Sequence, residues 1–171
     1  MGWLKKIIAS VIVVGLGFFL TTRFTDGPIG IVTGGAFSSG EVVSNEPDWR
    51  FLKDYNTVEF QLLEPARSRT SWIAEHDGRI FIPSGYMLST VGKIWKQWPL
   101  QAEKDGRAIL RVDNKLYPRQ LVRITDDPIL PAVLAELSRK YGNGSTMPVS
   151  EVSRGSLWVF ELVQRLSLIH I

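Results

Sequence analysis

Two short turn motifs, each between runs of strand-forming residues, constrain the fold of this chain more than any other feature. Asp77-Gly78 lies between the apolar runs 72–74 and 80–82, and Asp113-Asn114 lies between two further apolar runs. Glycine adopts the positive φ angles that tight hairpin turns need, and aspartate and asparagine tolerate them. The region 67–123 is therefore predicted to hold two antiparallel β-hairpins at the centre of the domain.

Hydrophobic patterning predicts the elements around these hairpins. Residues 57–64 alternate apolar and polar side chains, which is typical of a half-buried strand. Few parallel connections fit such a pattern, so we expect an α+β fold built on a mostly antiparallel partial barrel with flanking helices. The other predicted elements are a helical turn at 46–52, strands at 68–75, 79–83 and 157–164, a helix over 90–104 broken near Pro99, and a helix between Asp126-Asp127-Pro128 and Gly142.

The first 24 residues hold an apolar run, 7–20, that only Ser10 interrupts. Helix of this length covers about 21 Å, and the flanking residues extend it toward the roughly 30 Å of a hydrocarbon core. We expect an uncleaved single-span membrane anchor; a cleaved signal peptide and a buried core helix are the alternatives. Lys5 and Lys6 outweigh Arg23, so the N-terminus is predicted to be cytoplasmic and the domain to lie on the outer side of the cell membrane.

The segment after the anchor, 26–45, is rich in glycine and small polar residues. It is interpreted as a connector with two tight turns, although Gly34-Gly35 could also form a backbone nest for an anion. The last six residues, 166–171, resemble the translated end of a transposon adaptor, and we expect them to be non-native. The predicted organisation is an anchor at 1–24, a Gly-rich connector with a short helix at 25–55, the barrel domain at 56–165 and the tail at 166–171.

Charge and composition exclude several classes of function. The anchor holds three of the 20 basic residues of this 171-residue chain, and the 17 that remain equal the 17 acidic residues. A net neutral domain gives no support for a nucleic-acid partner. With no cysteine, the chain has no disulfide, thiolate nucleophile or cysteine-ligated zinc. His76, beside a turn, is interpreted as a solvated residue and not as a general base.

A group of basic and hydroxyl side chains lies at predicted strand ends and loops, interleaved with aromatic residues. Guanidinium and hydroxyl groups suit a phosphate, and flat aromatic walls suit a planar ring. A phosphorylated planar ligand is thus chemically sensible, the alternative being that the tryptophans are core and the arginines a solvated rim. The group comprises Arg67, Arg69, Thr70, Ser84 and Lys93, with Trp72, Tyr86, Trp95 and Trp98.

The order of motifs over 56–125 resembles the split β-barrel family of pyridoxamine-phosphate oxidase-like and deazaflavin-dependent nitroreductase-like proteins. The resemblance is carried by a strand, the Asp-Gly turn, Ile-Pro-Ser-Gly at 82–85, Lys-Ile-Trp-Lys-Gln-Trp-Pro at 93–99 and the second hairpin. It implies FMN or a deazaflavin as cofactor, and a homodimer whose interface contributes to the cofactor site. The cofactor-binding residues that it implies are Arg67, Arg69, Thr70, Pro83, Ser84, Gly85, Lys93 and Trp95.

The sequence therefore supports two hypotheses of function. The first is a membrane-anchored oxidoreductase-like protein in which the chain orients the ring of a flavin or deazaflavin. The second is a barrel without catalysis or cofactor, which binds a small apolar or phosphorylated ligand or acts as a structural module at the membrane surface.

Overall fold

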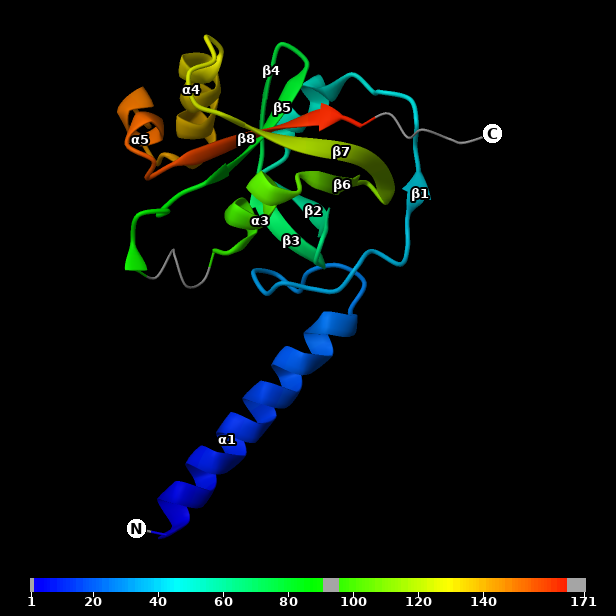
Figure 1. Cartoon of the computed structure of the whole chain (residues 1–171), viewed down its shortest axis with the longest axis vertical. Coiled ribbons are helices and arrows are strands. Elements are labelled where there is room, and N and C mark those ends of the chain that lie inside the picture. Colours follow the sequence, from blue (N-terminus) through cyan, green and yellow to red (C-terminus); the bar gives the residue numbers. More distant parts are fainter. Residues whose placement is uncertain (1, 91–95, 166–171) are drawn as a thin grey trace.

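A long N-terminal helix projects from a curled β-sheet that carries helices on its outside (Figure 1). The computed structural model describes residues 2–90 and 96–165. The elements are α1 (Gly2–Thr21), the 3₁₀ turn η1 (Thr22–Phe24), β1 (Glu41–Val42), the 3₁₀ helix η2 (Trp49–Asp54), β2 (Thr57–Leu63), β3 (Ala66–Trp72), β4 (Ala74–His76), β5 (Arg79–Ser84), α3 (Trp98–Lys104), β6 (Arg107–Val112), β7 (Lys115–Ile124), α4 (Leu130–Tyr141), α5 (Val149–Ser153) and β8 (Trp158–Gln164).

The described strands form one eight-stranded sheet in the order β3-β2-β6-β7-β8-β5-β4, with β1 beside β7. Every pair is antiparallel except β1 with β7. The two ends of this order, β3 and β4, follow each other in the chain, so the sheet curls back on itself. The predicted α+β fold, a mostly antiparallel split barrel with flanking helices, is confirmed.

The two predicted hairpins are present. Asp77 and Gly78 have φ angles of 51° and 76°, and Asp113 and Asn114 have φ angles of 49° and 60°. Positive φ at both central residues is the geometry of a type I′ turn, whose twist matches that of the flanking strands. The turns join β4 to β5 and β6 to β7.

The single strand predicted at 68–75 is wrong, because the chain changes partners at Ile73. Residues before it, in β3, pair with β2, and residues after it, in β4, pair with β5. The end of α4 replaces the sheet partner of Ile73: its amide donates to the Tyr141 hydroxyl at 3.0 Å, and its carbonyl accepts from Lys140 at 2.9 Å. No ladder joins β3 to β5 among the described residues, and the barrel is split there.

The sheet buries apolar side chains on both faces. The inner face forms one cluster, which includes Phe60, Ile82, Leu110 and Phe160 and is closed by Trp98 of α3. The outer face of β4, β5 and β8 forms a second cluster with α4. The predicted apolar face of that helix is confirmed, since Val133, Leu134 and Leu137 are buried and Ile129 packs against the same cluster.

One helical prediction differs from the structure, and one short helix was not predicted. Pro99 lies in the first turn of α3 and does not break a helix, because a proline at that position loses no intrahelical hydrogen bond. Residues 91–95, in the first half of that predicted helix, lie outside the described residues, as does the tail at 166–171. The short helix α5 was not predicted, because five residues are too few for a helical period.

The connector between anchor and barrel packs on the outer side of β3. Gly34 exchanges backbone hydrogen bonds with Ser68, and the Ser68 hydroxyl donates to the carbonyl of Gly35 at 2.6 Å. A Cβ atom at Gly35 would lie 2.6 Å from the carbonyl oxygens of Arg23 and Thr25. The two glycines thus let three backbone segments approach closely, which fits the connector interpretation of this stretch.

Candidate functional site

A cavity of about 640 Å³ lies where β3 ends and the chain crosses to β4. Its volume is within the range of small-molecule sites. We call it the split-end cavity. Residues lining it come from β3, the end of β5, the start of α3, the end of α4 and the α5 loop: Thr70, Ser71, Trp72, Pro83, Ser84, Gly85, Tyr86, Lys96, Trp98, Tyr141, Gly142, Ser145, Met147, Glu151, Ser156 and Leu157.

Stacked aromatic rings form one wall of the split-end cavity. The rings of Trp72 and Tyr141 are nearly parallel, with an interplanar angle of 3° and centroids 4.4 Å apart. Tyr141 is held in place because its hydroxyl bonds the backbone of Ile73. Trp72 is 47% exposed, so part of its ring is open to a ligand. This wall suits a flat, apolar group.

Lys96 supplies the basic group of the split-end cavity. Its ammonium donates to the Gly85 carbonyl at 3.2 Å and lies 5.6 Å from the centre of the Tyr86 ring. No carboxylate within 4 Å pairs with it in the described part of the chain. Burial lowers the pKa of Lys96. A half-buried ammonium without a carboxylate partner among the described residues suits an anionic ligand.

Small polar groups at the end of β5 complete the lining. Ser84 is buried and its hydroxyl donates to the sulfur of Met87 at 3.4 Å, whereas a Cβ at Gly85 would meet no atom within 4 Å. Tyr86 is 77% exposed and has a φ angle of 62°, which is uncommon for a residue with a side chain. Backbone of this kind clusters at binding sites.

The carboxylate of Glu151, which lines the cavity, is already hydrogen-bonded to other side chains of the protein. Glu151 accepts hydrogen bonds from the Ser156 hydroxyl and from Arg154. These bonds, that of Ser156 first, lower the pKa of Glu151. Its carboxylate closes the turn between α5 and β8, and we assign it no role toward a ligand.

Four of the eight predicted site residues line the split-end cavity: Thr70, Pro83, Ser84 and Gly85. The Thr70 hydroxyl, however, donates to the Gly30 carbonyl at 2.8 Å, so it serves the connector. Lys93 and Trp95 lie outside the described residues.

Arg67 and Arg69 do not line this cavity. They face Leu62 and Phe60 across the ladder, on the inner side of β3, whereas Thr70 faces Glu59 on the outer side. Desolvation, with a smaller contribution from Arg67, lowers the pKa of Arg69 to about 10. The Arg69 guanidinium bonds the Arg67 carbonyl at 3.1 Å and Gln101 at 3.5 Å. Their role at a phosphate stays a prediction.

Lys96 and Tyr141 were not among the predicted site residues. Lys96 lies three positions after Lys93 in the same Lys-Ile-Trp-Lys motif, from which the prediction named Lys93 and Trp95 but not this residue. Tyr141 reads from the sequence only as the end of a helix. Tyr141 approaches β3 because α4 packs over the sheet, and a local sequence pattern does not predict such packing.

Other candidate sites are weaker. A second cavity of about 450 Å³ lies between the connector and the β6–β7 turn, but its basic residue Arg111 is already paired with Asp26 and Glu59. The described residues contain no group of three or more histidine, aspartate or glutamate side chains that could hold a metal ion. The split-end cavity is therefore the candidate functional site.

Comparison with known proteins identifies similar folds only. No protein-family model and no curated protein matches the chain. A provisionally assigned pyridoxamine 5'-phosphate oxidase from Listeria innocua is similar over 67% of this chain and 88% of its own, with a TM-score of 0.46 and 11% identity. A conserved hypothetical protein from Mycobacterium tuberculosis is similar over 77% and 86%, with a TM-score of 0.49 and 14% identity.

The fold assignment rests on the sheet itself, whose curled, mostly antiparallel half-barrel is the architecture that the sequence resemblance implies.

Proposed function

We propose that this protein is a membrane-anchored, oxidoreductase-like split barrel that binds FMN or a deazaflavin in the split-end cavity. The observation that carries the proposal is the pairing, in one cavity, of a stacked aromatic wall with an ammonium group that has no carboxylate partner among the described residues. A planar ring with an anionic tail needs both features.

Some residues of the cavity would contact the planar ring of such a ligand, and others would contact its anionic group. Trp72 supplies a flat apolar surface for the ring, and Tyr141 holds that indole in place. Lys96 binds the anionic group, and Gly85 leaves room for close approach of the ligand to the backbone. A bound flavin or deazaflavin would supply hydride transfer, while the chain would bind and orient it.

The anchor is the second part of the proposal. α1 and η1 together form a helix of 23 residues that is long and apolar enough to cross a membrane. We propose that it does so with Lys5 and Lys6 in the cytoplasm and the barrel outside, following the positive-inside bias.

Titration of full-length protein in detergent with flavin mononucleotide, and separately with a deazaflavin, tests the cofactor. Lys96→Met removes the ammonium and keeps the length of the side chain. Loss of a charge-assisted hydrogen bond of about 1.5 to 3 kcal/mol should weaken binding about 10- to 150-fold. Lys104→Met, at an exposed lysine of α3, is the matched control and should bind like the wild type.

Wild-type protein that binds neither compound at micromolar concentration would contradict the cofactor proposal. Such a result would favour the second hypothesis, a non-catalytic barrel that takes another small ligand or acts at the membrane surface. Equal affinities of the two lysine variants would instead remove Lys96 from the site.

A further inference from the structure

The end of the barrel nearest the anchor exposes large apolar side chains. Phe24 is 90% exposed and Ile31 is 91% exposed, and Ile29 is 45% exposed. Ile29 and Val32 form an isolated antiparallel bridge, and Gly30 between them has a φ angle of 58°, so the segment 28–32 is a tight loop with Ile31 at its tip. All three residues belong to the short stretch 24–31, and large apolar side chains left exposed in one segment are candidates for an interaction surface.

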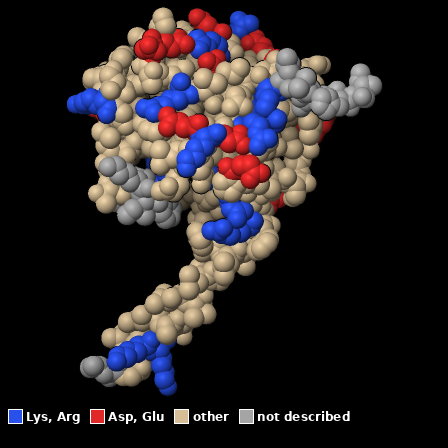
Figure 2. Space-filling model, viewed as in Figure 1, with Lys and Arg blue, Asp and Glu red and all other residues tan. Residues whose placement is uncertain are grey.

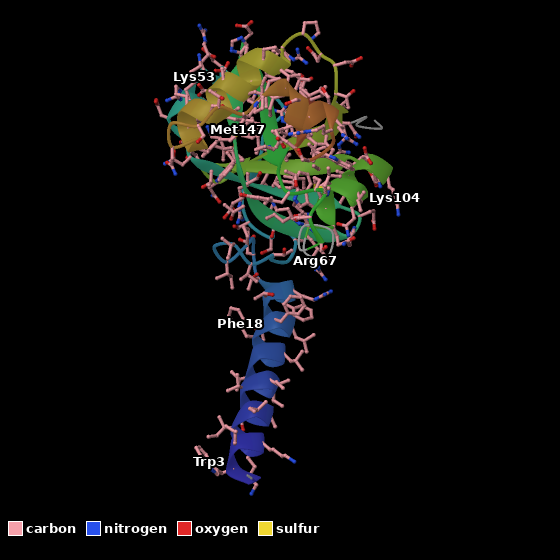
Figure 3. The ribbon with its side chains drawn as sticks, turned by 90° about the vertical axis from the view of Figure 1, so that its left-hand side faces the viewer. Trp3, Phe18, Lys53, Arg67, Lys104 and Met147 are labelled. Carbon is pink, nitrogen blue, oxygen red and sulfur yellow. The ribbon has the colours of Figure 1, made fainter. Side chains whose placement is uncertain are left out.

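The loop 28–32 is held at a fixed place between anchor and barrel. Gly35 packs against the backbone of Arg23 and Thr25 at the end of η1, and Gly34 packs against that of Gly27. Both glycines are hydrogen-bonded to Ser68 of β3. Thr70 of the same strand bonds the carbonyl of Gly30. Figures 1 and 3, which differ by a quarter turn, both place this part of the connector between the end of α1 and the β2–β3 side of the barrel.

Helix length sets the depth of this loop relative to a bilayer. The 23 residues of α1 and η1 span about 34 Å at 1.5 Å per residue, slightly more than a hydrocarbon core of about 30 Å. A spanning helix of this length ends where the headgroup region begins. The loop 28–32 begins four residues after the helix end at Phe24 and then lies within that region.

Basic side chains lie at the same level. Figure 3 shows Arg67 at about the height of the end of α1, and Arg23 belongs to η1. Neither side chain has an ion pair with a carboxylate in the part of the chain that the structure describes. Apolar residues together with free basic ones are the combination that interfacial segments use on membranes with anionic lipids.

We propose that Phe24 and the loop 28–32 form a second membrane contact, at the boundary of headgroups and acyl chains, which holds the barrel with its β2–β3 side toward the lipid bilayer. This inference rests on the proposed spanning of α1. With two membrane contacts, α1 and the loop 28–32, the orientation of the barrel relative to the bilayer becomes fixed.

Single-cysteine variants test the contact without background, since the chain has no cysteine of its own. Ile31→Cys, Val149→Cys and Ile12→Cys are each labelled with a nitrobenzoxadiazole dye and reconstituted into vesicles of phosphatidylcholine and phosphatidylglycerol. All three positions are exposed in the protein, and Val149 of α5 lies far from α1 (Figure 1). Quenching is measured with aqueous iodide and with a doxyl-labelled lipid.

We expect iodide to quench the label at position 31 several-fold less than the label at position 149, and the doxyl lipid to quench only positions 31 and 12. A label at 31 that iodide reaches as freely as at 149, with 12 shielded, would overturn the contact and leave the anchor standing. Equal shielding at 31 and 149 would overturn the orientation. Free access at all three positions would reject both the contact and the anchor.

Discussion

Asp26 ties the connector to the barrel through one carboxylate. It accepts hydrogen bonds from the amide of Ser38 at 2.8 Å, from the hydroxyl of Ser39 and from Arg111 of β6 at 2.9 Å. These bonds, that of the Ser39 hydroxyl first, hold the pKa of Asp26 well below its usual range. The ionised form is therefore favoured by folding.

We predict that Asp26→Asn lowers the melting temperature of the protein at pH 7 and has a smaller effect at pH 3. A depressed carboxyl pKa stabilises the fold above the unfolded pKa of about 3.9 and loses that contribution as pH falls toward the folded pKa. Thermal unfolding in detergent at both pH values measures the difference. Asp126→Asn, at an exposed residue, is the control; an unchanged gap between wild type and Asp26→Asn at pH 3 would contradict the assignment.

Alternation along β3 decides which side chains can meet at a site. Arg67 and Arg69 share the inner face of the strand, and Thr70 lies on the other. The period of two in a strand could have separated them from sequence alone. Arg67, Arg69 and Thr70 share a side-chain chemistry that suits a phosphate, and that chemistry groups them although their positions in the strand do not.

At the scale of elements, the close packing of the connector segment 34–35 on the connector segment 27–28 depends on Gly34. A Cβ atom there would lie 1.8 Å from the carbonyl oxygen of Gly27. We expect Gly34→Ala to cost about 1 to 3 kcal/mol in unfolding free energy, as overpacking against backbone does. Denaturant unfolding measures it, with Gly85→Ala as the control because its Cβ would meet open space. Equal stabilities of the two variants would show that the connector gives way freely.

Local chemistry explains which elements could be predicted. The Asp77-Gly78 and Asp113-Asn114 turns are encoded by the residues that form them, and both hairpins are where the sequence places them. The split at Ile73 is not encoded locally, because its backbone partners belong to α4, almost 70 residues later. The lining of the split-end cavity follows the same rule: the residues at the end of β5 belong to a sequence motif, whereas Tyr141 comes to the cavity only in the folded chain.

At the scale of the whole molecule, charge is distributed unevenly between anchor and barrel. Acidic and basic side chains are interspersed on the visible face of the barrel, whereas the far end of α1 carries basic side chains alone (Figure 2). A balanced surface gives no long-range field for a polyanion. The excess of basic side chains at the far end of α1 therefore bears on which side of a membrane that end faces, and not on the binding of a polyanion.

We predict that the barrel lies on the outer side of the cell membrane. In intact cells, a membrane-impermeant maleimide should label Asp77→Cys, whose native side chain is 84% exposed on the β4–β5 turn, but should label Gly2→Cys only after permeabilisation. Two positive side chains, Lys5 and Lys6, precede the apolar run and one, Arg23, follows it, so retention of this end of α1 in the cytoplasm is favoured. Labelling of Gly2→Cys and not of Asp77→Cys in intact cells would show the opposite orientation and place the split-end cavity in the cytoplasm.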